Sequence, residues 1–258
     1  MSIKVLVTRP EAQAAGWVQR LRERGFDAAS LPLIGIAPPA DPAPVVAAWG
    51  RLADYSLAVF VSPNAAEQFF ALRPRGMVWP DSTLAGSTGP GTSQALRGFG
   101  VPLASLVAPA ADAPQFDSEA LWALLAPLPW RDRGVLIVRG DGGRDWLADT
   151  LRAHGAQVMP LCAYRRIAPS FTPAQCSQLD AALAQPAAHV WLFSSSEAIA
   201  ALAAAAPGAT WAAVRAIATH PRIAETARDA GFGDVILARP ELEAVAACLQ
   251  SLPLSSAP

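Results

Sequence analysis

Hydroxyl, glycine and arginine residues recur in this sequence directly after short apolar runs. The segments are Thr8-Arg9-Pro10, Ser62-Pro63-Asn64, Gly86 to Thr92, Arg139-Gly140, Ser194-Ser195-Ser196 and Thr219-His220-Pro221. Such groups bind anions without covalent chemistry when they lie at helix N-termini. Each serine or threonine is also a common helix N-cap, but the recurrence favours a shared anion-binding surface. Its candidate contacts are Arg9, Ser62, Asn64, Thr92, Arg139, Gly140, Ser194, Ser196 and Thr219.

A second kind of chemistry is offered by Tyr164, one of only two tyrosines in the chain. It stands beside Arg165 and Arg166 at the end of an apolar segment. A tyrosine in such a place can donate a proton or a hydrogen bond to a leaving group. The alternative is a packing residue at a domain junction. Arg144 joins Arg9 and Arg139 as a candidate for contacts with carboxylates.

The sequence lacks the motifs of common nucleotide-binding, metal-binding and hydrolase sites. The run Gly140-Asp141-Gly142-Gly143 has Asp145 where a dinucleotide loop needs its third glycine, and Lys4, the only lysine, is outside any phosphate-loop motif. The three histidines have no His or Cys neighbour at metal-ligand spacing. Ser194-Ser195-Ser196 lacks the glycines of a nucleophile elbow. We therefore predict neither a metal nor an organic cofactor.

The elements that position these residues form an internal repeat. Val5 to Arg9 corresponds to Val135 to Arg139 at an offset of 130, and Gly25 corresponds to Gly155. Later pairs continue the match: Val59 to Ser62 with Trp191 to Ser194, and Thr88-Gly89-Pro90 with Thr219-His220-Pro221. Each copy contains an apolar run, an amphipathic helix that ends at glycine, and a further run, which is a βαβ unit. The last strands are expected at Val101-Pro102 and Asp234 to Leu237.

Strands that alternate with helices of this length predict parallel sheets covered on both faces. Each half has room for about five strands, as in a flavodoxin-like doubly wound sheet. In such sheets ligands bind beyond the carboxyl ends of the strands, where the candidate residues lie. A helix is predicted over the segment from Asp117-Ser118-Glu119 to Leu125, which has an N-cap and apolar spacing. Trp17, Trp146, Trp191 and the three cysteines are expected to be buried packing residues.

Composition narrows the class of protein. Of 258 residues, 52% are apolar and 16% charged, and the net charge is −1. No basic face suggests nucleic acid, and no apolar run approaches the length of a membrane span. The N-terminus lacks the pattern of a secretory signal, and the cysteines form no C-x-x-C pair. We expect a cytoplasmic protein that binds neither nucleic acid nor membranes.

These residues resemble those of uroporphyrinogen-III synthases over essentially the whole chain. The resemblance lies in Val5 to Pro10, Phe60 to Ala65, Gly89 to Thr92 with Ala95-Leu96, Gly155 to Tyr164, Phe193 to Ser195 and Ala216 to Thr219. It implies two flavodoxin-like α/β domains joined by a two-stranded linker, with an active cleft between them. One domain would comprise residues 1–37 with 168–258, and the other residues 38–167. The repeat alone suggests a simple division near Trp130.

The resemblance also implies an activity: a lyase of haem biosynthesis that cyclises hydroxymethylbilane to uroporphyrinogen III, with loss of water and inversion of ring D. It implies a cofactor-free monomer that receives its substrate from hydroxymethylbilane synthase. Tyr164 matches the family tyrosine that helps the hydroxyl leave. Thr92 matches a cleft threonine, and Ser62, Ser194 and Ser196 match strand-end serines. Ala218-Thr219-His220-Pro221 departs from the family turn because it lacks a glycine and a following threonine.

Two other classes of protein fit parts of the sequence. A non-catalytic two-domain binding or sensor protein for an anionic metabolite would use the same hydroxyl-lined strand ends. A nucleotide-dependent transferase would need phosphate loops, which the sequence lacks. Turnover of hydroxymethylbilane separates the enzyme from the binding protein.

Overall fold

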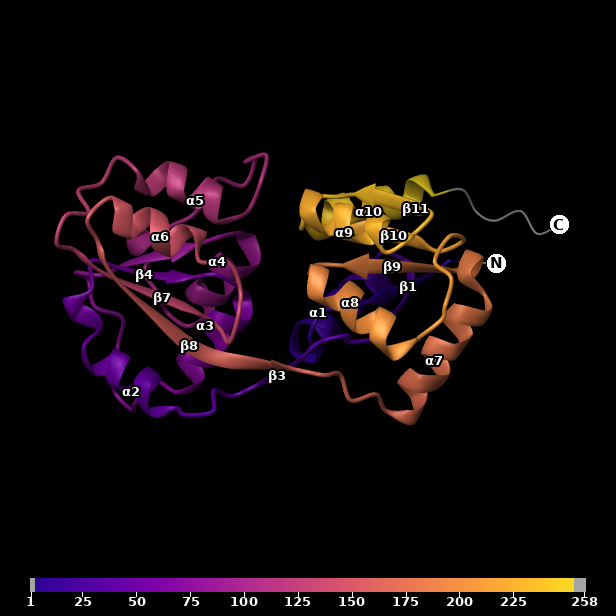
Figure 1. Ribbon diagram of the computed structural model, residues 1–258, viewed down its shortest axis with the longest axis horizontal. Helices are drawn as coiled ribbons and strands as arrows, with labels where there is room; N and C mark the ends of the chain where they lie inside the picture. Colours follow the sequence, from indigo (N-terminus) through magenta and orange to yellow (C-terminus); the bar gives the residue numbers. More distant parts are fainter. Residues whose placement is uncertain (1–2, 253–258) are drawn as a thin grey trace. The chain divides into compact units, whose positions relative to one another are not determined.

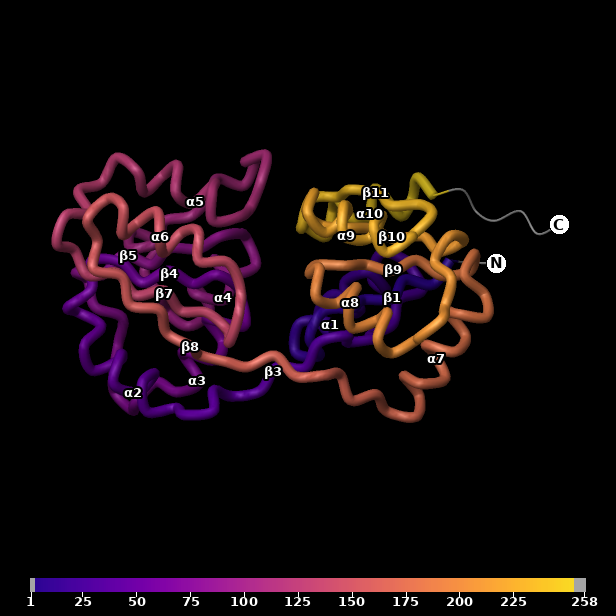
Figure 2. The backbone as a smooth tube through the Cα atoms, viewed as in Figure 1, coloured from indigo at the N-terminus to yellow at the C-terminus, as the bar shows by residue number. Residues whose placement is uncertain are grey.

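In the computed structural model, which describes residues 3–252, the chain forms two compact units (Figure 1). Unit 1 consists of the segment up to Gly35 and the segment from Ile167 onward, and unit 2 of Ile36–Arg166. The chain passes between the units at β3 (Gly35–Ala37) and at the end of β8 (Gln157–Ile167). These two strands are neighbours in one sheet, and Figure 2 traces both crossings.

Unit 1 is built on a five-stranded sheet in the order β11-β10-β9-β1-β2, and all neighbouring strands are parallel. The strands are β1 (Lys4–Val7), β2 (Asp27–Ser30), β9 (His189–Phe193), β10 (Arg215–Ala218) and β11 (Asp234–Leu237). Every residue of β9 is buried, because a central parallel strand is covered on both faces. The strand order is that of a flavodoxin-like sheet.

Helices cover both faces of this sheet. They are α1 (Glu11–Glu23), α7 (Pro173–Ala184), α8 (Ser196–Ala205), α9 (Pro221–Asp229) and α10 (Leu242–Ser251), with a short 3₁₀ turn η3 (Pro186–Ala188) before β9. Val18 of α1 and Val245 of α10 belong to one apolar cluster with Val5 and Val190. Helices α8 and α9 contact each other over the other face.

Unit 2 holds a six-stranded sheet in the order β3-β8-β7-β4-β5-β6. Besides β3 and β8, its strands are β4 (Leu57–Phe60), β5 (Leu84–Ser87), β6 (Leu106–Val107) and β7 (Gly134–Gly140). The pairs from β8 through β6 are all parallel. The order β8-β7-β4-β5-β6 in unit 2 corresponds to the order β2-β1-β9-β10-β11 in unit 1. In unit 2, however, the chain runs through β4, β5 and β6 before it reaches β7 and β8. Unit 2 is therefore a circularly permuted copy of unit 1.

The helices of unit 2 also form two layers (Figure 1). They are α2 (Ala43–Gly50), α3 (Pro63–Ala71), α4 (Pro90–Gly98), α5 (Ser118–Leu125) and α6 (Trp146–Ala153), with 3₁₀ turns at Leu52–Asp54 and Leu103–Ser105. An aromatic cluster that includes Trp49, Phe60 and Phe69 packs α2, α3 and α4 on one face. Leu121 and Leu151 belong to the cluster of α5 and α6 on the other.

The repeat in the sequence corresponds to equivalent strands in the two units. Strand β1 matches β7, β4 matches β9, and β5 matches β10 in spatial order. Gly25 and Gly155 end the first helix of each βαβ unit with φ of 84° and 90°. Only glycine adopts such values without strain, so it ends both helices. The predicted fold class, an α/β protein with two doubly wound parallel sheets, is confirmed.

Three expectations about local structure were wrong. Val101-Pro102 is not a strand; the ladder begins at Leu106, beyond a 3₁₀ turn. Trp146 begins α6 with 38% of its surface exposed, because Leu147, Ala148 and Leu151 form the buried face of that helix. Cys162 and Cys176 are exposed as well. Trp17 and Trp191 are buried as expected.

Candidate functional site

The carboxyl end of the unit 2 sheet brings three of the predicted residues into contact. Ser62 follows β4, Gly140 ends β7 and Tyr164 lies on β8 opposite Gly140 in the ladder. The Ser62 Oγ atom lies 3.2 Å from the Tyr164 Oη atom. The ring of Tyr164 is part of the apolar core, with 1% of the residue exposed, while its hydroxyl meets polar atoms.

Ser62 has two roles at once. It is the N-cap of α3, where its Oγ accepts a hydrogen bond from the Ala65 N–H at 3.1 Å. The same oxygen is the partner of the Tyr164 hydroxyl. The alternative of a plain N-cap therefore describes only part of its contacts. Asn64 is the second residue of α3, and Thr92 is buried in the first turn of α4.

The structure leaves no room for a side chain at Gly140. A Cβ atom at this position would lie 2.8 Å from Tyr164 Cζ and 2.9 Å from Arg166 Nη1. Both distances are far shorter than a van der Waals contact, so the rings and guanidinium occupy the space a side chain would need. Gly140 was predicted as a contact for an anion, and the structure gives it the further role of seating Tyr164.

Arg166 is a residue of this cluster that the sequence-based set left out. Its Nη2 atom donates to the Tyr164 hydroxyl at 3.1 Å, and its guanidinium carbon lies 5.2 Å from the tyrosine ring centroid. Side chains two apart on a strand point to the same side. That spacing from Tyr164 was a signal that could have selected Arg166 over Arg165.

Two arginines predicted to contact carboxylates already have acidic partners. Arg139 pairs with Asp145 and donates to the Gly143 carbonyl at 2.8 Å, so it closes the loop after β7. Arg144 forms two hydrogen bonds with the Glu119 carboxylate, one of them 3.0 Å long. The hydrogen bond to Glu119 raises the pKa of Arg144. A substrate contact would require either arginine to give up its partner.

Arg9 has a different environment at the carboxyl end of β1 in unit 1. Its guanidinium carbon lies 4.5 Å from the ring centroid of Trp17, and its buried Nε has no hydrogen-bond partner. Burial, with a smaller contribution from the charge of Arg20, lowers the pKa of Arg9 to about 10. The residue as a whole is half-buried.

The remaining predicted residues of unit 1 lie near helix starts. Ser194 follows β9, but the N-cap of α8 is Ser195, which accepts from the Glu197 N–H at 3.1 Å. The Ser196 and Thr226 hydroxyl oxygens lie 3.0 Å apart, and because Thr226 donates to the Arg222 carbonyl, Ser196 is the donor in this contact between α8 and α9. Thr219 is buried after β10, and its neighbour His220 caps α9 through Nδ1.

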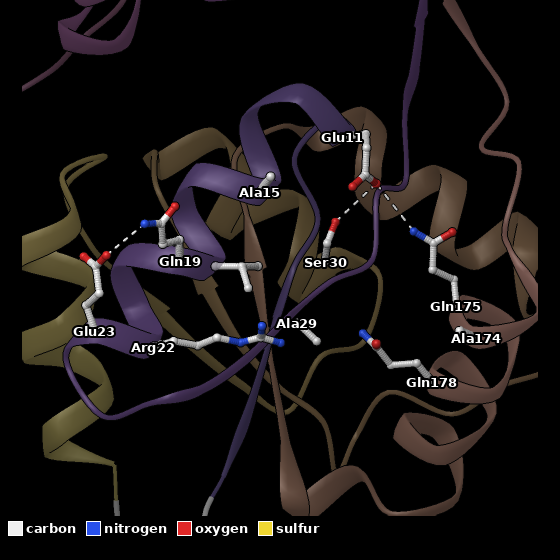
Figure 3. A pocket seen from close by; sticks show the side chains of 11 residues that line it. Glu11, Ala15, Gln19, Arg22, Glu23, Ala29, Ser30, Ala174, Gln175 and Gln178 are labelled. Atoms are coloured by element: carbon white, nitrogen blue, oxygen red, sulfur yellow. Dashed lines mark hydrogen bonds between the residues drawn. The ribbon is translucent and has the colours of Figure 1, made fainter.

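An open pocket of unit 1 is lined by a separate set of residues (Figure 3). It has a volume of about 590 Å³ and is lined by α1, β2 and α7. Glu11 accepts hydrogen bonds from Ser30 at 3.4 Å and from Gln175 at 3.5 Å across it. None of the predicted site residues lines this pocket.

The described part of the chain contains neither a metal-binding cluster nor a membrane-spanning helix. Within residues 3–252, no group of three or more His, Cys, Asp or Glu side chains is arranged to hold a metal ion. In the same part of the chain no helix combines the length and apolar character needed to cross a membrane.

Comparison with solved structures identifies the fold. A mutant uroporphyrinogen III synthase of Thermus thermophilus aligns over 96% of both chains, with a TM-score of 0.60 and 17% identity. Uroporphyrinogen-III synthetase of Helicobacter pylori aligns over 98% of this chain and all of the other, with a TM-score of 0.60 and 16% identity. At these identities the likeness concerns the fold.

Sequence comparison identifies the family. The uroporphyrinogen-III synthase of Proteus mirabilis is 30% identical over 64% of this chain and 81% of its own length. That of Synechococcus elongatus is 29% identical over 74% of this chain and 69% of its own. The family model described as uroporphyrinogen-III synthase HemD matches residues 15–247, a span that reaches into both units. The chain therefore belongs to the uroporphyrinogen-III synthase family.

Proposed function

We propose that this chain cyclises hydroxymethylbilane to uroporphyrinogen III, with loss of water and inversion of ring D. The family and the relatives support this activity. The structural observation that carries it is the Tyr164 hydroxyl, which lies within hydrogen-bond distance of Ser62 and Arg166 at the carboxyl end of a parallel sheet. Ligands of such sheets bind beyond the carboxyl ends of the strands, which supports a role for this hydroxyl.

The reaction needs little acid–base catalysis. The pyrrole nitrogen supplies the electron pair that expels the terminal hydroxyl, and the departing oxygen needs one proton to leave as water. Tyr164 is proposed to supply that proton, as a general acid. The proton released when the attacking pyrrole regains aromaticity after closure restores the tyrosine hydroxyl, so the enzyme returns to its starting state.

Geometry has to supply the specificity. Hydroxymethylbilane closes spontaneously to the type I isomer, so the enzyme must hold the chain in a fold that favours attack by the other carbon. We propose that residues at the carboxyl ends of the strands bind its acetate and propionate groups. Contacts are assigned to Arg9, Asn64, Thr92, Ser194, Ser196 and Thr219, with Arg139 contributing when its pair with Asp145 opens.

The assay that tests the activity separates two isomers. Freshly prepared hydroxymethylbilane is incubated with the protein, the products are oxidised, and the porphyrins are resolved by chromatography. We expect predominantly the type III isomer, formed faster than the spontaneous reaction. Type I product at the spontaneous rate would favour the rival binding or sensor protein. The Tyr164→Phe variant and a protein-free sample are run beside it.

Arg9 provides a test of carboxylate binding. We expect Arg9→Met to raise KM for hydroxymethylbilane by about tenfold, as for loss of one charge-assisted contact. The same change should raise the free energy of unfolding by about 1 kcal/mol, and Tm by about 3 °C, because relief of a buried charge outweighs the lost stacking on Trp17.

The expected gain in stability follows from the lowered pKa of Arg9. Its cost to the folded state is fully present at pH values below about 10 and declines as the pH rises through that value. Thermal unfolding and steady-state kinetics at neutral pH measure both effects. The matched control is Arg51→Met, which removes an exposed arginine paired with Asp54 at 3.2 Å. Equal KM values for Arg9→Met and the wild type would remove Arg9 from the binding surface.

We also propose a compartment, an oligomeric state and a source of substrate for this chain. The three cysteines are free, which supports operation in the reducing cytoplasm. We propose that the chain acts as a monomer and receives hydroxymethylbilane directly from hydroxymethylbilane synthase. A short transfer would limit spontaneous closure of the substrate on the way.

A further inference from the structure

Arg166 is held by Asp141, the residue directly after strand β7. Its backbone N–H donates to Asp141 Oδ1 at 3.1 Å, and its Nη1 lies 3.9 Å from the same oxygen. The Asp141 N–H in turn donates to the Tyr164 carbonyl at 3.1 Å. One carboxylate therefore holds both the backbone and the guanidinium of Arg166, while Gly140 leaves the space that the guanidinium needs.

The contact between Arg166 and Tyr164 has a direction. A guanidinium has only donors, so the Tyr164 oxygen must accept the hydrogen bond from Nη2. Its own proton is then left for another acceptor. Ser62 Oγ lies 3.2 Å from the Tyr164 hydroxyl oxygen and can accept that proton while it also accepts a hydrogen bond from Ala65. Ser62 is half-buried, whereas Tyr164 is buried.

We propose that Arg166 is a positioning residue, which turns the proton of Tyr164 toward Ser62 and keeps it available for the leaving hydroxyl. This inference rests on the proposed cyclisation. In the step it serves, the carbon–oxygen bond of the terminal hydroxymethyl group breaks, and the electron pair stays with the oxygen. That oxygen takes the Tyr164 proton and departs as water. The tyrosinate left behind keeps its hydrogen bond from the Arg166 cation until closure returns a proton.

Substitution of Arg166 tests the proposal. We expect Arg166→Met to lower kcat by about tenfold, the scale of a general-acid contribution, with KM changed less than twofold. Arg166→Lys retains a charged donor on a flexible stem and should recover part of the loss. Because Arg166 acts through Tyr164, adding Arg166→Met to Tyr164→Phe should lower kcat no further.

The neighbouring residue supplies the control. Arg165→Met changes the adjacent arginine, which is exposed and donates to the Pro38 carbonyl at 3.2 Å. We expect it to have the kcat of the wild type, and thermal unfolding should show all variants folded at the assay temperature. The proposal is overturned if Arg166→Met turns over like the wild type, or if its effect multiplies that of Tyr164→Phe. A wild-type protein that forms no type III isomer would instead refute the activity itself.

Discussion

Tyr164→Phe is expected to lower kcat by about tenfold or more, the range typical of a single general acid. The substitution removes one oxygen and keeps the ring that fills the core of unit 2. Arg166 and Ser62 each lose a partner at 3.1 Å and 3.2 Å, but both are half-buried and water can replace it. Stability should therefore change little, and the loss should lie in turnover.

The chain offers a matched control for this experiment in its other tyrosine. Tyr55 is also buried, with 6% exposed, and its hydroxyl contacts the Met159 sulfur at 3.1 Å. Tyr55→Phe removes the same oxygen from the same unit, and we expect the kcat of the wild type. Initial rates of type III isomer formation compare the two variants. Equal rates for Tyr164→Phe and Tyr55→Phe would show that Tyr164 only packs.

Gly140→Ala should have the second large effect, on stability and turnover together. The new methyl group would lie 2.8 Å from Tyr164 Cζ, so either the tyrosine ring or strand β7 must move. Overpacking of this kind costs about 1–3 kcal/mol. It also displaces the hydroxyl from Ser62, and we expect kcat to fall by about tenfold or more because small misplacements of catalytic groups are costly.

A glycine two residues along the chain isolates this steric effect. Gly142 has no atom within 4 Å of the position its Cβ would take. Gly142→Ala should therefore retain both the Tm and the kcat of the wild type. Thermal unfolding and the isomer assay are applied to the pair. If Gly140→Ala behaves like Gly142→Ala, Gly140 does not seat Tyr164.

Much of each sheet could be predicted from the sequence because its signals are local. Continuous apolar runs indicate covered parallel strands, and Gly25 and Gly155 end helices at backbone angles that other residues avoid. The helix behind Asp117 was predicted from its N-cap and spacing, and it forms over Ser118–Leu125. Residues after strands come together in a doubly wound sheet, so Ser62, Gly140 and Tyr164 could be chosen before their contacts were known.

Side-chain partners within the site could not be predicted in the same way. The sequence places Arg139 at the end of a strand and Arg144 after it, but does not show that Asp145 and Glu119 pair with them. The two-residue spacing puts Arg166 on the same side of a strand as Tyr164, but the hydrogen bond to the tyrosine hydroxyl is seen only in the structure. These contacts depend on backbone direction and on residues distant in the chain, which spacing alone does not encode.

The sequence by itself determined that the chain contains two copies of one α/β pattern, with hydroxyl and arginine residues after the strands. Only the tertiary structure decided how the copies are divided, because β1 pairs with β9 and β4 pairs with β7. Each half of the chain supplies an equivalent βαβ unit, so local propensity is satisfied by either pairing. The choice belongs to long-range strand contacts, and those contacts bring Ser62 from one copy to Tyr164 from the other.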